Sequence, residues 1–143
     1  MDLGDLIRDE SEAYIRAQCT ETLKKPAFIQ FFLNHEHLKE LRKNLRLQIF
    51  GAELKFGVEM DVGRVRKIIR AGVDVFMHAA LEQAKLNHMS QAERKRLEDM
   101  AGKEKAAAEW YEDQQRDLKS TAISASMYTP GQETKKHHPP QGS

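Results

Sequence analysis

The amino-acid sequence predicts an all-α protein: a small helical bundle with a central antiparallel helix hairpin, a long polar C-terminal helix and an extended C-terminal tail. Apolar residues recur every three or four positions through residues 35–86, and no stretch alternates strictly as a half-buried strand would. Pro26 alone interrupts the first 129 residues, which leaves long stretches open to helix. At 143 residues, the chain can bury the core of such a bundle.

The first helix is expected from about Leu3 to Leu23. Acidic residues at its start and lysines after its end suit the helix dipole. Its apolar stripe is incomplete, because Glu10 and Ser11 interrupt it. Cys19 lies in this stretch, and we expect a buried thiol there. Pro26 either stops the helix or occupies the first turn of the next one.

Aromatic and branched residues are densest between positions 28 and 33, where we expect a short helix that plugs the core. Asn34 can cap a second long helix, expected to cover about His35 to Glu59. One heptad-like seam along it consists of Leu38, Leu41, Leu45, Ile49, Ala52 and Phe56. A second apolar stripe consists of Leu47, Phe50, Leu54 and Val58. Two stripes predict burial on two sides, so we interpret this helix as the core helix.

A third helix is expected from Val62 to about Leu86, with Asp61 as its N-cap. Gly63, Gly72 and the pair at positions 79 and 80 (both alanine) would let another helix approach closely. Only a short connection near residue 60 separates the second and third helices. We therefore expect them to be antiparallel neighbours.

The last helix should begin at Ser90, because Ser90 and Glu93 have the spacing of a capping box. It is expected to extend from Gln91 to about Lys119, roughly 44 Å at 1.5 Å per residue. Its surface is mostly polar, so it either bridges solvent or docks along a narrow stripe onto another subunit. We divide the chain into a helical core domain (1–89), a long C-terminal helix (90–126) and an extended tail (127–143). The last two regions have little apolar surface of their own, so we expect them to find their contacts on another molecule.

Composition narrows the function classes. The formal net charge of +1 argues against bulk attraction to nucleic acid or anionic lipid. A single cysteine provides no internal disulfide framework. No apolar run approaches the ~18–20 residues that span a bilayer, and the N-terminus lacks the basic and apolar regions of a signal peptide. We therefore expect a cytoplasmic or virion-associated protein without a membrane span.

The string from His35 to His37 is the most metal-like part of the sequence. A helical zinc site needs two imidazoles four residues apart, but Lys39 occupies the second position of that pattern. His35 and His37 are two apart and point to different faces of a helix. Cys19 has no base or acid nearby in sequence, and no glycine-rich phosphate loop follows a strand. We expect no metal, no cofactor and no catalytic residue, and hence no enzyme.

The preferred function is that of a non-enzymatic structural or adaptor subunit of a larger assembly, either a homo-oligomer or one with other subunits. Small helical adaptors with projecting arms occur in phage and virus particles, which makes such a particle the expected setting by analogy of style. The candidate partner-binding residues are Leu97, Trp110, Tyr111, Leu118 and Tyr128.

Two other functions remain open. The first is a nucleic-acid-binding or DNA-packaging factor that uses two basic clusters, whose members are Arg42, Lys43, Arg46, Arg64, Lys67 and Arg70. No recognition-helix turn or aromatic stacking motif accompanies these clusters. The second is a small helical regulatory inhibitor that docks one helix on a target enzyme.

Overall fold

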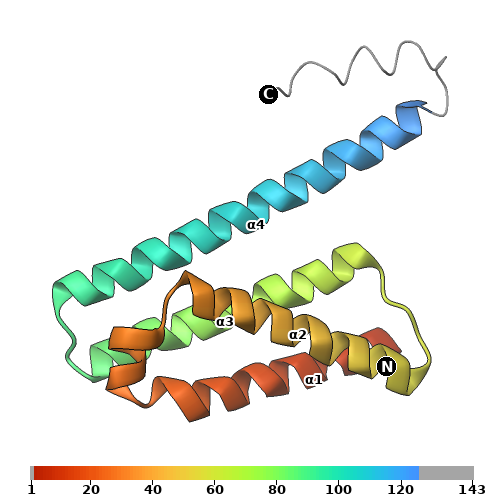
Figure 1. Ribbon diagram of the computed structural model, residues 1–143. Helices are drawn as coiled ribbons and strands as arrows, with labels where there is room; N and C mark the ends of the chain where they lie inside the picture. The colour runs from red at the N-terminus through yellow and green to blue at the C-terminus, as the bar shows by residue number, and fades with distance from the viewer. Residues whose placement is uncertain (1, 126–143) are drawn as a thin grey trace. The chain divides into compact units, whose positions relative to one another are not determined.

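A computed structural model describes residues 2–125 of the chain, with side chains described as far as residue 114 (Figure 1). Every regular element among these residues is a helix, so the predicted all-α bundle is confirmed. The expected tail at 127–143 lies outside the described residues. The helices are α1 (Leu3–Gln18), α2 (His35–Phe56), α3 (Val62–Leu86) and α4 (Gln91–Ala125), with short π-helical turns η1 (Cys19–Leu23) and η2 (Phe28–Phe32) between α1 and α2.

Local sequence signals set most helix starts. Four side chains accept a hydrogen bond, at 2.8–3.2 Å, from the backbone N–H three residues further on: Asp2, Asn34, Asp61 and Ser90. The predicted caps of the second, third and fourth helices are therefore confirmed. Pro26 occupies the first turn of the segment that leads into η2, which is one of the two expected positions.

The helix ends differ more from expectation. Helix α2 stops at Phe56, three residues early, because Gly57 adopts a left-handed φ of 68° and closes the helix. The carboxylate of Glu53 then accepts a hydrogen bond from the Met60 backbone N–H at 2.7 Å, which fixes the connection to α3. Helix α4 runs to Ala125, beyond the expected end near Lys119.

Helices α1, α2 and α3 pack against one another, with α2 antiparallel to the other two (Figure 1). The predicted antiparallel hairpin of α2 and α3 is thus confirmed. Gly72 of α3 lies where the three helices meet: a Cβ there would approach Leu45 Cδ1 to 3.0 Å and Ile15 Cγ1 to 3.1 Å. The stripe of α1 continues through Ser11, which is buried and donates its hydroxyl hydrogen to the Ile7 carbonyl at 3.1 Å.

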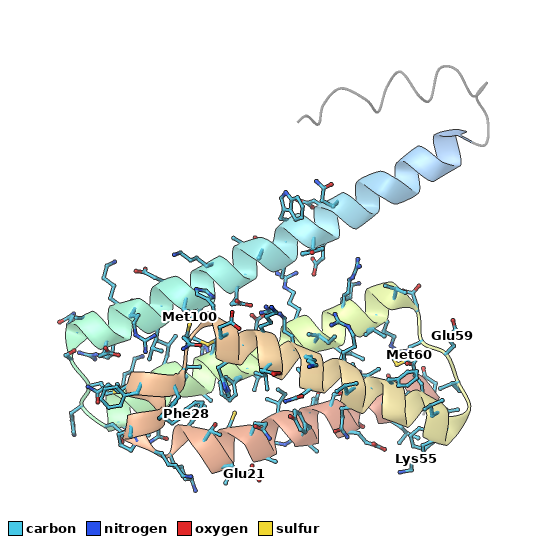
Figure 2. All side chains as sticks on the ribbon, in the orientation of Figure 1. Glu21, Phe28, Lys55, Glu59, Met60 and Met100 are labelled. Carbon is cyan, nitrogen blue, oxygen red and sulfur yellow. The ribbon has the colours of Figure 1, made fainter. Side chains whose placement is uncertain are left out.

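The first turns of α4 belong to the same compact unit as the three-helix core. The chain divides into Met1–Lys105 and Ala106–Ser143, so the division falls inside α4 and not at residues 89 and 90. Leu97 and Met100 are buried in the core of the first unit, and Met100 is labelled in Figure 2. The Arg96 guanidinium donates to the carbonyls of Ile29 at 2.9 Å and Leu33 at 3.0 Å. The expectation that residues from 90 onward need another molecule is therefore wrong for the first turns of α4.

Two expectations about burial also fail. The second stripe of α2 is exposed at Leu47, Phe50 and Leu54, so α2 is buried on one side only. In η2 the predicted plug is partial, because Ile29 is buried whereas Phe31 and its neighbour at 32 are exposed.

Candidate interaction surfaces

An apolar line runs along the side of α2 that is turned away from the core. Leu47, Phe50 and Leu54 are 58%, 55% and 69% exposed, and their spacing of three and four places them on one face. The buried residues of α2, such as Leu45 and Ile49, lie on the opposite side of the helix. We call Leu47, Phe50 and Leu54 the outward face of α2. A surface helix normally carries polar residues in this position, so the outward face is a candidate interaction surface.

Backbone shape and charge add to this surface. Gly51 follows Phe50, and a methyl group in place of its hydrogen would meet no atom within 4 Å, so the helix backbone is open to close approach there. Exposed charges of both signs precede the outward face: Glu36, Lys39, Glu40, Lys43 and Arg46. After it come two exposed carboxylates, Glu59 and the N-cap Asp61, near the end of the hairpin where Figure 2 labels Glu59.

A groove with a volume of about 460 Å³ lies between α1 and α3, and we call it the α1–α3 groove. Its lining combines apolar and small residues with cations and one carboxylate: Arg8, Ser11, Glu12, Ile15, Arg16, Arg64, Lys67, Ile68, Ala71, Gly72 and Val75. This groove was not predicted from the sequence. The sequence held one weak indication of a basic surface on α1: Arg8 and Arg16 lie eight residues apart, on the same broad side of the helix.

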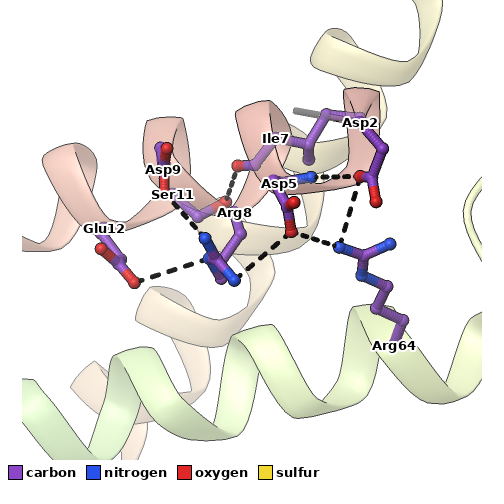
Figure 3. Close-up of polar contacts among 8 residues, drawn as sticks. All are labelled: Asp2, Asp5, Ile7, Arg8, Asp9, Ser11, Glu12 and Arg64. Carbon is purple, nitrogen blue, oxygen red and sulfur yellow. Dashed lines mark hydrogen bonds and ion pairs between the residues drawn. The ribbon is translucent and has the colours of Figure 1, made fainter.

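Two of the groove's arginines already have carboxylate partners in the chain. Arg64 donates to Asp5 at 2.9 Å and lies 3.6 Å from Asp2, so it links α3 to the start of α1 (Figure 3). Arg8 lies 3.4 Å from Asp5 and 3.9 Å from Glu12. Hydrogen bonding to the Asp5 backbone N–H is the main cause that lowers the pKa of Asp2, with the Arg64 charge acting in the same direction.

Arg16 and Lys67 differ from these two arginines. Both side chains are exposed, and neither forms an ion pair with a carboxylate among the residues that the structure describes. Arg16 comes from α1 and Lys67 from α3, so each wall of the groove offers a cation without a counter-charge in this part of the chain.

The six residues of the alternative nucleic-acid site do not form one uniform patch. Arg42 pairs with Glu104 of α4 and Arg64 pairs with Asp5, so two of these cations are neutralised within the chain. Lys43 and Arg46 are exposed on α2, whereas Lys67 lies at the α1–α3 groove. Arg70, the remaining member, is half-buried. The pairing leaves less positive charge for phosphate contacts than the sequence suggested.

The predicted partner-binding residues fall into three groups. Leu97 is fully buried in the core, so it is not a surface residue and leaves the set. Trp110 and Tyr111, in the unit that begins at Ala106, are 58% and 55% exposed, and their rings meet edge to face at 5.4 Å. The side chains of Leu118 and Tyr128 lie outside the described part of the chain.

The histidines near the start of α2 separate as their spacing predicts. His35 Nδ1 lies 3.2 Å from Glu104 Oε2, whereas His37 packs between Phe28 and Phe76 with ring centroids 4.8 and 5.7 Å away. The His37 Nε2 atom is buried and has no hydrogen-bond partner among the described residues. Burial lowers the pKa of His37, and the negative charge of Glu40 opposes that shift.

Cys19 is only partly buried at the edge of the core, and desolvation raises the pKa of its thiol, which keeps it protonated near neutral pH. Within residues 2–125, no three His, Cys, Asp or Glu side chains are grouped as metal ligands would be. None of the described helices has a long enough apolar stretch to cross a bilayer.

Comparisons with protein-family models, with curated proteins and with solved structures find no match to this chain.

Proposed function

We propose that this protein is a non-enzymatic structural or adaptor subunit of a larger assembly, and that its outward face of α2 pairs with the same face of a second copy. The observation that carries the proposal is the exposure of Leu47, Phe50 and Leu54 directly opposite the core of α2. Three large apolar side chains in a line cost free energy while they face water, and a partner surface removes that cost. A phage or virus particle is the expected setting.

A second copy fits this face because the face is self-complementary when two α2 helices pair antiparallel. A two-fold axis near Phe50 places Leu47 of one copy against Leu54 of the other. The open backbone at Gly51 lets the two helices approach closely beside the paired phenylalanines. In the same arrangement Lys43 of one copy lies opposite the C-terminal end of α2 in the other copy, and Glu59 follows shortly after that end.

The size of the surface predicts weak pairing. Fully burying a Leu or Phe side chain contributes ~1.5–3 kcal/mol, and these residues are 55–69% exposed, so six of them contribute roughly 5–11 kcal/mol in total. Association costs about 4–15 kcal/mol in lost translational and rotational freedom. The isolated chain should therefore dimerise in the high micromolar range or above, and many copies in a symmetric assembly would strengthen the contact through avidity.

Sedimentation equilibrium of the full chain over a concentration series tests the proposal. The wild-type protein should show reversible dimer formation, and Phe50→Glu should abolish it, because the substitution places two carboxylates together near the two-fold axis. Phe31→Glu is the matched control, since Phe31 is comparably exposed at 68% but lies on η2. Lys43→Glu should weaken the dimer, and adding Glu59→Lys should restore it.

A wild-type chain that stays monomeric at millimolar concentration would overturn the pairing. So would equal effects of Phe50→Glu and Phe31→Glu, because the outward face would then have no special role. Far-UV circular dichroism confirms that each variant keeps its helix content, which exposed positions should allow.

A further inference from the structure

We propose that the α1–α3 groove is a docking site for an acidic amphipathic helix of a partner protein. This surface is separate from the outward face of α2, so docking here goes beyond the proposed function. Either proposal can be wrong while the other holds.

The shape of the groove fits a short stretch of helix. Its lining runs from Arg8 to Arg16 on α1 and from Arg64 to Val75 on α3, about 12 Å and about 17 Å of helix at 1.5 Å per residue. Two to three turns of a third helix have that length. A channel between two parallel helices is also the kind of surface in which a helix lays its apolar side.

The floor of the groove is apolar and consists of buried side chains. Ile15 and Ile68 are 1% and 7% exposed, so they form a closed base, and Val75, which is 52% exposed, offers surface that a ligand can cover. Ala71 and Ser11 are small, so they leave room above the base for the backbone of an incoming helix.

The charges on the two walls specify the partner's chemistry. Arg16 on α1 and Lys67 on α3 are exposed and make no ion pair with a carboxylate among the described residues. Arg64 adds positive charge at one end of the groove, although Asp5 shares it. Among the described residues that line the groove, Glu12 is the only carboxylate. A partner helix with an apolar stripe and acidic residues on both flanks would therefore meet complementary charge on each wall.

The test uses three probes with the full chain at low salt. The first is a synthetic, fluorescein-labelled 15-residue helix with a leucine and alanine stripe flanked on both sides by glutamate. The second is the same peptide with glutamine at every glutamate position. The third is dodecanoate, a small anionic amphiphile, added as a competitor. Fluorescence anisotropy measures binding of each peptide.

The glutamate peptide should bind at least tenfold more tightly than the glutamine peptide, and its affinity should fall as salt is added. Lys67→Glu and Arg16→Glu should each weaken it by roughly tenfold, since each converts an attraction into a repulsion. Ala71→Trp, which fills the groove without changing charge, should abolish binding. Lys103→Glu is the control of equal charge change, because Lys103 is exposed on α4 away from the groove lining.

Three results would overturn the inference. The two peptides could bind equally, the groove variants could bind like Lys103→Glu, or dodecanoate could bind at a site that Ala71→Trp blocks while the glutamate peptide does not bind. The last result would assign the groove to a small anionic amphiphile and not to a protein helix. Dimerisation measured in parallel would be unchanged by Ala71→Trp, so a failure here remains distinct from a failure of the α2 contact.

Discussion

Replacing Arg96 with alanine should release the start of α4 from the bundle more than any nearby surface change. The guanidinium donates hydrogen bonds to the carbonyls of Ile29 in η2 and of Leu33 directly after it, and a third, at 3.3 Å, to Glu93 on its own helix. Ile29 lies within η2 and Leu33 is the C-cap residue of that turn. Arg96 therefore ties the start of α4 to η2 and to the residue that follows it.

The expected magnitude follows from these contacts. A hydrogen bond to a charged group contributes ~1.5–3 kcal/mol net. The Arg96 side chain is 37% exposed, so water can replace part of what is lost, and the ion pair with Glu93 adds only a few tenths of a kcal/mol. We expect Arg96→Ala to lower the free energy of unfolding by about 2–3 kcal/mol. With a urea m-value of ~2 kcal/mol per molar, the midpoint should fall by about 1 M or more.

Urea unfolding followed by circular dichroism at 222 nm measures this loss. Lys95→Ala is the matched control, because Lys95 is the preceding residue of α4 and its side chain is 74% exposed. Arg96→Lys keeps the charge but loses the two-pronged geometry, so it should fall between wild type and Arg96→Ala. Equal midpoints for Arg96→Ala and Lys95→Ala would refute the reasoning and show that Arg96 adds nothing to what Leu97, Met100 and Glu104 contribute to holding α4.

Three glycine and histidine positions give further tests. Gly51→Ala should raise the free energy of unfolding by roughly 0.5–1 kcal/mol, because the site is helical, exposed and open. Gly57→Ala should lower the free energy of unfolding by about 1 kcal/mol, because φ at this position is 68°. Urea midpoints that move in the same direction for the two variants would contradict this prediction. Burial lowers the pKa of His37 in the folded protein below its ordinary value near 6.5, so the unfolded chain takes up a proton on this histidine more readily than the folded chain does. The contribution of His37 to stability should therefore be complete above pH 6.5 and be lost as the pH falls through the folded-state pKa. His37→Phe should flatten that loss relative to the exposed control His78→Gln, and parallel pH profiles for the two variants would exclude the histidine as its source.

Local signals explain why so much of the fold follows from sequence. Side chains such as Asn34 and Ser90 satisfy the first backbone N–H groups of a helix within three residues, so a helix start needs no information from the rest of the chain. The heptad-like seam of α2 also predicted its buried residues, Leu45 among them.

Periodicity alone could not decide how many faces of a helix are covered. The two stripes of α2 look alike in sequence, yet Leu45 is 0% exposed and Leu54 is 69% exposed. The number of neighbouring helices decides which stripe is buried, and this number is a property of the tertiary fold.

The attachment of α4 was missed for a related reason. Its apolar content is thin, and the contact of Arg96 with η2 joins residues more than sixty positions apart. The α1–α3 groove likewise needs α1 and α3 to run side by side, so neither Arg16 nor Lys67 could be assigned to a shared surface beforehand.

Gly72 has a consequence for how the bundle melts. At that point of α3 the side chains of Ile15 from α1 and Leu45 from α2 both approach within van der Waals contact of the missing methyl group. Separating any one helix from this point exposes apolar surface on the other two as well, so none can leave at low cost. The three helices should therefore exchange their amide hydrogens through a single cooperative opening, with similar protection on all three sides of that glycine.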